Sequence, residues 1–249
     1  MKDAPRKLAV IAAVAFAIAA PAAQAVLDIG LSASQFADQG DSTLRAAGYA
    51  FSIWSLIYLG LIAYALWQAL PRNTGNPAIR ALAWPSALAI ALTGAWIFAS
   101  ALNERWLTVA IIVAAAAAMV FGLMRASRGK STFMDWLLVW WPLGLLGGWL
   151  TIASAVNILT VMTAEGLIGS GSALLYGMAG VIATAAVALW VLRRTAVLPY
   201  GAAVTWGLVA VWVAERPGEP ALAWLAMACA VVVGLAALWW GRPATAGKR

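Results

Sequence analysis

The chain contains no histidine, and only one of its 249 residues is a cysteine, Cys229. The absence of histidine removes the commonest general base, the commonest metal ligand and the usual axial ligand of haem. A single cysteine cannot form an intramolecular disulfide or a cysteine-rich metal site. We therefore expect neither catalytic residues nor a metal site.

Charged residues are also scarce. They make up 10% of the chain, whereas a typical soluble domain contains about 25%. Hydrophobic residues make up 64%, and the mean hydropathy is +0.89. The isoelectric point of about 10.1 would suit a nucleic-acid partner, but the basic residues are scattered over short loops, where they act as membrane-orientation signals. The composition predicts a membrane protein and no nucleic-acid binding.

Eight hydrophobic runs, each close to the length that crosses the hydrocarbon layer, predict an all-α, polytopic helical bundle with no soluble domain. We expect no Asp, Glu, Lys or Arg inside these runs, because burying a charge in the bilayer is unfavourable. The expected spans are Leu8–Val26, Gly48–Leu70, Ile79–Leu102, Trp106–Met124, Phe133–Met162, Ser172–Leu192, Val197–Ala214 and Ala221–Trp240.

Basic and acidic residues alternate between successive connections. All but three of the sixteen basic residues lie at the two ends of the chain or in the second, fourth and sixth connections, and seven of the nine acidic residues lie in the other connections. Connections rich in Lys and Arg remain on the cytoplasmic side of a membrane. The pattern predicts a multi-pass inner (plasma) membrane protein with both termini in the cytoplasm.

The first run has two interpretations. Basic residues near the N-terminus, the apolar stretch Leu8–Ala20 and the small residues Ala23–Ala25 are also typical of a cleavable signal peptide. We favour a retained helix. Cleavage would leave seven helices in the same orientation. After this run comes the longest connection, Leu27–Ala47, which is polar and, by the charge pattern, external.

Small residues are frequent within the runs. Gly144 and Gly148 lie four residues apart in the fifth run, and small residues at this spacing let two helix backbones approach closely. We favour packing within the chain, and a dimer interface is the alternative.

Fifteen tryptophans are several times the usual share for a chain of this length. Those near the ends of runs fit the aromatic belt at headgroup depth. Trp54, Trp96, Trp149 and Trp206 lie more than one turn inside their runs. At that depth an indole ring either packs in the core or forms the wall of a pocket for a flat ligand, and composition alone favours packing.

The second run carries a recognisable motif. In Gly48–Gly60, glycine, phenylalanine, tryptophan and tyrosine recur at the spacing of the second-helix signature of the tryptophan-rich sensory protein family, also called TspO/MBR or translocator proteins. Trp149, Ala153 and Asn157 resemble the family's fifth-helix pattern. In the third run Trp96 matches, with Thr93 where the family usually has asparagine. Asn103 and Trp106 match the family's pattern of asparagine and tryptophan three residues apart more closely. They lie in a charged turn, however, so we favour Trp96.

The resemblance covers about residues 6–163. It implies a five-helix bundle, often a homodimer, that binds porphyrins and other flat hydrophobic molecules between the first external loop and the outer halves of the helices. We accordingly divide the chain into a TspO/MBR-like domain, residues 1–163, and three additional helices with a basic tail, residues 164–249. Arg45 is the external base nearest to a porphyrin's propionates. The expected ligand-binding residues are Arg45, Tyr49, Phe51, Trp54, Tyr58, Trp96, Trp149 and Asn157.

We interpret the chain as a sensor or carrier, not an enzyme, that binds a porphyrin, another tetrapyrrole or a lipid-like molecule and requires no cofactor. A metal-free tetrapyrrole fits best, because no histidine is present to bind iron. One alternative is an accessory subunit of a larger, pigment-containing membrane complex. Another is a small-molecule transporter in which Pro85 and Pro142 break helices near a site. The expected partners are membrane lipids, the ligand, and a second copy or a larger complex.

Overall fold

The computed structural model describes residues 3–40, 43–126 and 132–241. In these residues eight helices are long and apolar enough to cross a membrane, and no strand is present. Each corresponds to one predicted run, so the prediction of an all-α membrane bundle is confirmed. The spans are α1 (Ala4–Val26), η2 with α3 (Gly48–Ser52 and Ile53–Ala69), α4 (Pro77–Ala101), α5 (Arg105–Arg125), α6 with η4 and α7 (Phe133–Asp135, Trp136–Trp140 and Trp141–Ala164), α8 (Ser170–Thr195), α9 (Leu198–Glu215) and α10 (Pro220–Trp240).

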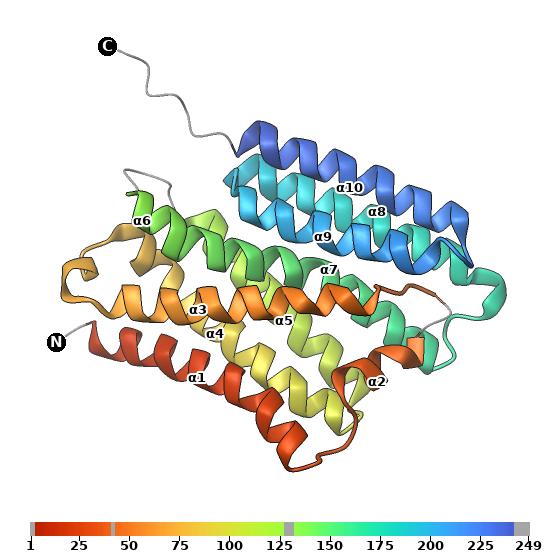
Figure 1. Ribbon diagram of the computed structural model, residues 1–249, viewed down its shortest axis with the longest axis horizontal. Coiled ribbons are helices and arrows are strands. Elements are labelled where there is room, and N and C mark those ends of the chain that lie inside the picture. The colour runs from red at the N-terminus through yellow and green to blue at the C-terminus, as the bar shows by residue number, and fades with distance from the viewer. Residues whose placement is uncertain (1–2, 41–42, 127–131, 242–249) are drawn as a thin grey trace.

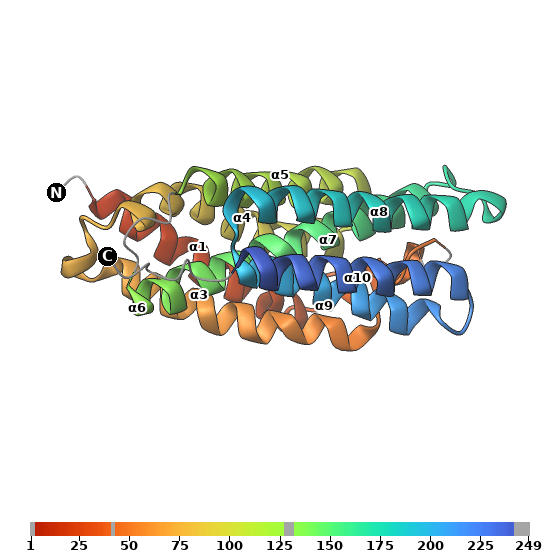
Figure 2. The same ribbon diagram turned by 90° about the horizontal axis from the view of Figure 1, so that it is seen from above.

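Helix α7 lies between two groups of helices. α3 and α5 pack on it from one group, which also contains α1 and α4, and α8 and α9 pack on it from the other, which also contains α10 (Figure 1). Figure 2 shows the same helices after a quarter turn, still running side by side along the bundle. The span that contains α7 has the largest buried share of the eight described spans, 61%. Its surroundings are therefore protein on most sides, whereas the other spans keep a larger exposed face.

Helix α7 approaches α9 closely at two glycines. A Cβ atom added at Gly148 would overlap the carbonyl oxygen of Tyr200, and one at Gly144 would lie 2.8 Å from the side chains of Val197 and Pro199. Between lipid-embedded helices, such close approach supplies van der Waals attraction that the hydrophobic effect does not. The glycine pair thus packs within the chain, as the favoured interpretation predicted, and its surface is occupied by α9.

Helix α1 packs against α4 in the bundle. A Cβ atom at Gly94 would lie 2.7 Å from the ring of Phe16. Val10, Val14 and Ala17 of α1 are buried. The first run therefore contributes apolar contacts to the core as a full helix.

Two charged residues, Arg80 and Asp135, lie inside the predicted runs, so the expectation of runs without charge was wrong near the helix ends. Arg80 is exposed in the first turns of α4, and Asp135 of α6 is buried. The carboxylate of Asp135 accepts hydrogen bonds from Trp67 Nε1 (3.1 Å), Asn76 Nδ2 (2.9 Å) and the Thr132 hydroxyl (2.9 Å). A buried charge is tolerated when such donors replace water.

Proline and asparagine residues determine where several helices begin. Asn76 caps α4 by accepting hydrogen bonds from the backbone N–H groups of Ala78 and Ile79, and Pro77 follows as the first helical residue. Proline is favoured there because the first helical N–H has no partner within the helix. Pro85 lies inside α4 without interrupting it, and Pro142 follows the π-helical turn η4.

The connections divide the bundle into two ends of opposite character. The end where α1 begins and α10 stops carries Arg72, Arg80, Arg193 and Arg194, and we call it the basic end. The other end carries the connections after α1, α4, α7 and α9, and we call it the acidic end. Its acidic residues are Asp28, Asp38, Glu104, Glu165, Glu215 and Glu219.

The contact between α7 and α9 gives a direct test of the packing. Gly148→Ala should destabilise the protein by about 1–3 kcal/mol, because the added methyl group forces the two backbones apart. Gly171→Ala is the matched control, since no atom lies within 4 Å of its Cβ position. The measurement is thermal unfolding in detergent. Equal midpoints for the two variants would contradict the proposed contact.

Candidate ligand-binding pocket

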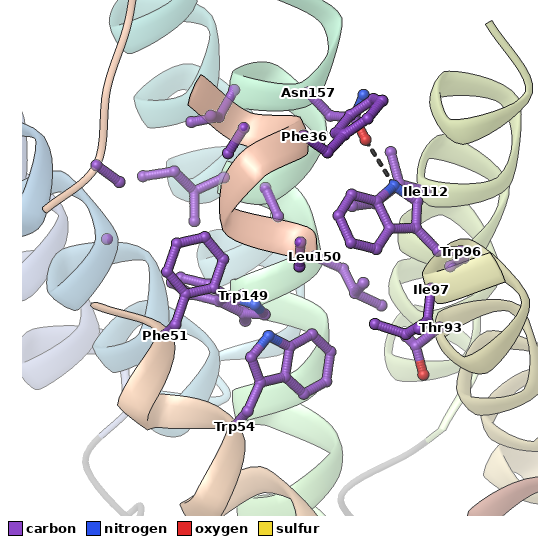
Figure 3. A pocket seen from close by; sticks show the side chains of 18 of the residues that line it. Phe36, Phe51, Trp54, Thr93, Trp96, Ile97, Ile112, Trp149, Leu150 and Asn157 are labelled. Atoms are coloured by element: carbon purple, nitrogen blue, oxygen red, sulfur yellow. Dashed lines mark hydrogen bonds between the residues drawn. The ribbon is translucent and has the colours of Figure 1, made fainter. Parts of the chain in front are cut away.

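A cavity of about 260 Å³ lies in the half of the bundle nearer the acidic end. Its wall is built from α1, α2 (Ala33–Ala37), η2, α3, α4, α5, α7 and α9, together with Ala46, and contains no charged residue. Figure 3 shows aromatic side chains from several of these elements turned toward the same space. Six of the eight predicted ligand-binding residues line it: Phe51, Trp54, Tyr58, Trp96, Trp149 and Asn157.

One wall is a cluster of aromatic rings from α3 and α7. Trp54 and Tyr58 are one helical turn apart and stack with ring centroids 5.2 Å apart. Trp149 meets Trp54 edge to face at 6.4 Å, and meets Phe51 in the same way at 6.1 Å. The second-helix motif and the fifth-helix motif therefore meet in one surface.

The opposite side of the cavity contains a hydrogen-bonded chain of polar side chains. Trp96 Nε1 donates to Asn157 Oδ1 (2.6 Å), and Asn157 Nδ2 donates to the Thr108 hydroxyl (3.0 Å). The Thr108 hydroxyl donates in turn to the carbonyl of Arg105. This chain joins α4, α7 and α5 and fixes the Trp96 ring across the cavity from the aromatic cluster (Figure 3).

Four polar groups of the wall remain available for a ligand. The indole N–H groups of Trp54 and Trp149 and the hydroxyls of Tyr58 and Thr160 have no hydrogen-bond partner among the described residues. The remaining surface is mainly apolar or aromatic. Small-molecule sites commonly combine such a wall with a few polar groups that orient the ligand. The arrangement can hold and orient an apolar molecule, and it offers no acid or base in the wall.

The structure places Arg45 and Tyr49 outside the cavity wall. The Arg45 side chain is turned to α9, where its Nε lies 3.5 Å from Glu215 Oε1 and its Nη2 donates to the carbonyl of Ala214 (3.2 Å). Tyr49 is 42% exposed and meets Trp206 edge to face at 5.2 Å. The wall thus contains no cation from Arg45, and both side chains instead contact α9.

Sequence reasoning missed several wall residues. Phe36 of α2 is 2% exposed and meets Trp96 edge to face at 5.9 Å. It is the only aromatic residue in the connection Leu27–Ala47, and that contrast could have identified it. Pro21 of α1 and Gly207 of α9 also line the cavity. Gly207 could not be found from the motifs, because it lies beyond residue 163.

The structure also separates the two tryptophans considered for the third-helix motif. Trp96 lines the cavity, as does Thr93, whose hydroxyl donates to the carbonyl of Ile90 within α4. Trp106 is 51% exposed in the first turn of α5. Among the residues that the structure describes, no group of three or more His, Cys, Asp or Glu side chains could hold a metal ion.

The bond between Trp96 and Asn157 can be tested by a double-mutant cycle. Trp96→Phe and Asn157→Ala should show a coupling free energy of about 1 kcal/mol in thermal or denaturant unfolding, because the same hydrogen bond is lost in both variants. In a control cycle, Ser154→Ala takes the place of Asn157→Ala and is again combined with Trp96→Phe. The Ser154 hydroxyl bonds to the carbonyl of Leu150 and not to Trp96. Equal coupling in the two cycles would show that the bond contributes nothing specific.

Comparison with known proteins agrees with this geometry. The sequence model of the TSPO-like protein family matches residues 7–239. Neither the curated proteins nor the solved structures give a match. The family match includes α8, α9 and α10, whereas the motifs alone had suggested a resemblance ending near residue 163. The division into domains at that position stays a prediction. Because the match covers nearly all of the eight-helix bundle, the chain belongs to the TSPO-like protein family, a family of membrane-embedded helical proteins.

Proposed function

We propose that the protein binds a flat, hydrophobic ligand in this pocket and acts as a sensor or carrier. The main support is that Trp54, Tyr58 and Trp149 form an aromatic cluster beside a cavity that has no charged residue in its wall. Ring faces interact favourably with other flat conjugated systems when they stack or meet edge to face. Membership of the TSPO-like protein family supports a binding role.

The chemistry of the wall restricts the ligand. A cavity of about 260 Å³ is near the lower end of the range of small-molecule sites, about 300–1,000 Å³. With no cation in the wall, a charged group on the ligand would have to remain outside, and the unpaired N–H groups of Trp54 and Trp149 suit an oxygen acceptor. A metal-free porphyrin meets the first of these conditions when its propionates stay out of the apolar part. Another tetrapyrrole or a lipid-like molecule that carries a neutral oxygen meets both.

The same wall favours binding over catalysis. General acid–base and nucleophilic chemistry require a side chain that exchanges protons or attacks at the site. The titratable side chain in the cavity wall is that of Tyr58. The polar groups that remain are suited to orienting a bound molecule.

We further propose that the basic end faces the cytoplasm and the acidic end, with the pocket, faces outward across an inner membrane. In a Cys229→Ser background, a membrane-impermeant maleimide should label Ser170→Cys in intact cells, because that position is exposed at the acidic end. Arg80→Cys, exposed at the basic end, should be labelled only after the cells are broken. The reverse pattern would overturn the orientation.

Binding itself is tested by titrating the purified protein with protoporphyrin IX and following tryptophan fluorescence. We expect saturable quenching, and a fall in affinity of about tenfold or more in the double variant Trp54→Ala with Trp149→Ala, since two ring contacts are lost. Absence of saturable quenching would refute the porphyrin ligand.

A matched control guards against quenching by light absorption alone. Trp84 belongs to α4 but is 58% exposed and does not line the cavity. Trp84→Ala should leave the affinity unchanged. If the double variant behaves like this control, the pocket is not the binding site.

A further inference from the structure

We propose that Glu215 of α9 is a positioning residue that holds the segment Thr43–Ser52 closed over the pocket, so that the C-terminal helices control how readily the pocket opens. The proposal rests on the proposed function in taking this pocket as the ligand site. It assigns a role to helices that lie beyond the sequence motifs.

The segment Thr43–Ser52 forms part of the cavity wall. Ala46 and Phe51 both line the cavity, and the Phe51 ring meets that of Trp149. Between them, Ala50 is fully buried. Movement of this segment away from the bundle would therefore remove one side of the pocket.

Helix α9 binds the backbone of this segment at three successive places. The N–H of Arg45 donates to Glu215 Oε1 (2.6 Å), and the N–H of Ala47 donates to the carbonyl of Ala210 (3.0 Å). Trp206 Nε1 donates to the carbonyl of Ala50 (3.1 Å). Trp206, Ala210 and Glu215 lie on successive turns of α9. The segment Thr43–Ser52 is therefore held along α9 by its backbone.

The segment supplies the cation and the hydrogen-bond donor that the Glu215 carboxylate needs. Glu215 is 4% exposed, and a buried carboxylate is stable only with a cation or hydrogen-bond donors nearby. Both come from Arg45, through its backbone N–H and through Nε at 3.5 Å. Opening the segment would leave the carboxylate without these partners, so the buried charge favours the closed position.

Helix α8 and the end of α7 support the same segment. The hydroxyl groups of Thr43 and Thr163 lie 2.7 Å apart. A Cβ atom at Gly177 of α8 would lie 2.6 Å from the carbonyl oxygen of Thr43, and Leu44 is 3% exposed. The glycine lets the segment rest on α8 without a gap. Two of the three C-terminal helices therefore contact the segment that closes the pocket.

The test measures opening without a ligand. In a Cys229→Ser background, Ala153→Cys places a thiol in the pocket wall, and its reaction with N-ethylmaleimide reports how often the pocket opens. Glu215→Gln keeps an oxygen acceptor for the Arg45 N–H and removes the charge. We expect labelling of the thiol to become about tenfold faster in Glu215→Gln, because opening of the segment no longer leaves a buried charge without a partner.

Glu165→Gln is the matched control. Glu165 lies at the same end and pairs with Arg105 at 3.0 Å, but it does not contact the segment Thr43–Ser52. The labelling rate should be unchanged in this variant. If Glu215→Gln labels no faster than Glu165→Gln, the proposal is overturned. Should Glu215→Gln fail to fold, Trp206→Phe removes the bond to Ala50 and keeps an aromatic ring beside Tyr49. It should raise the labelling rate by a smaller factor.

A second measurement separates this proposal from the proposed function. If the wild type binds protoporphyrin IX, stopped-flow quenching should show faster association and faster dissociation in Glu215→Gln with little change in Kd, because only the opening step is altered. If the association and dissociation rates are unchanged while the thiol is labelled faster, the proposal that Glu215 controls access of the ligand is overturned. If the wild type binds no protoporphyrin IX, the porphyrin ligand is refuted, and the labelling rates of the two glutamate variants still decide the role of Glu215.

Discussion

The close approach of α9 to α7 at Gly148 is the contact on which the rest of the structure depends. Only a residue without a side chain leaves room there for the carbonyl oxygen of Tyr200. This contact brings the remainder of α9 alongside the pocket, so that Gly207 joins its wall and Glu215 reaches Arg45. In a lipid environment, where apolar surface alone does not hold helices together, a contact of this kind determines the arrangement of neighbours.

The pocket follows from the same physical constraint as the spans. Charges are unfavourable in the hydrocarbon, so a cavity at that depth is lined by rings, aliphatic groups and neutral donors. Trp96 and Asn157 satisfy one another by a hydrogen bond, while the N–H groups of Trp54 and Trp149 have no partner in the described part of the chain. A wall of this composition can recognise the shape and the acceptor groups of an apolar ligand, and it is poorly suited to proton transfer.

Two buried carboxylates show how charge is accommodated at the ends of the spans. Asp135 is surrounded by N–H and O–H donors from three segments, and Glu215 is paired with Arg45. Each joins parts of the chain that are distant in sequence. Neither role is visible in the local pattern, because an acidic residue near the end of a hydrophobic run has the same appearance whether it faces water or a partner.

The sequence by itself determined the class, the spans and much of the pocket. Hydrophobic length defines a membrane helix locally, and the resemblance of the motifs around Trp54, Trp96 and Trp149 to those of a known family pointed to six residues that line the cavity. The tertiary structure alone decided that Arg45 turns to Glu215 and away from the cavity, and that Phe36 and Gly207 complete the wall. These placements depend on which helices become neighbours, and that depends on contacts between residues far apart in the chain, such as Gly148 with Tyr200 and Arg45 with Glu215.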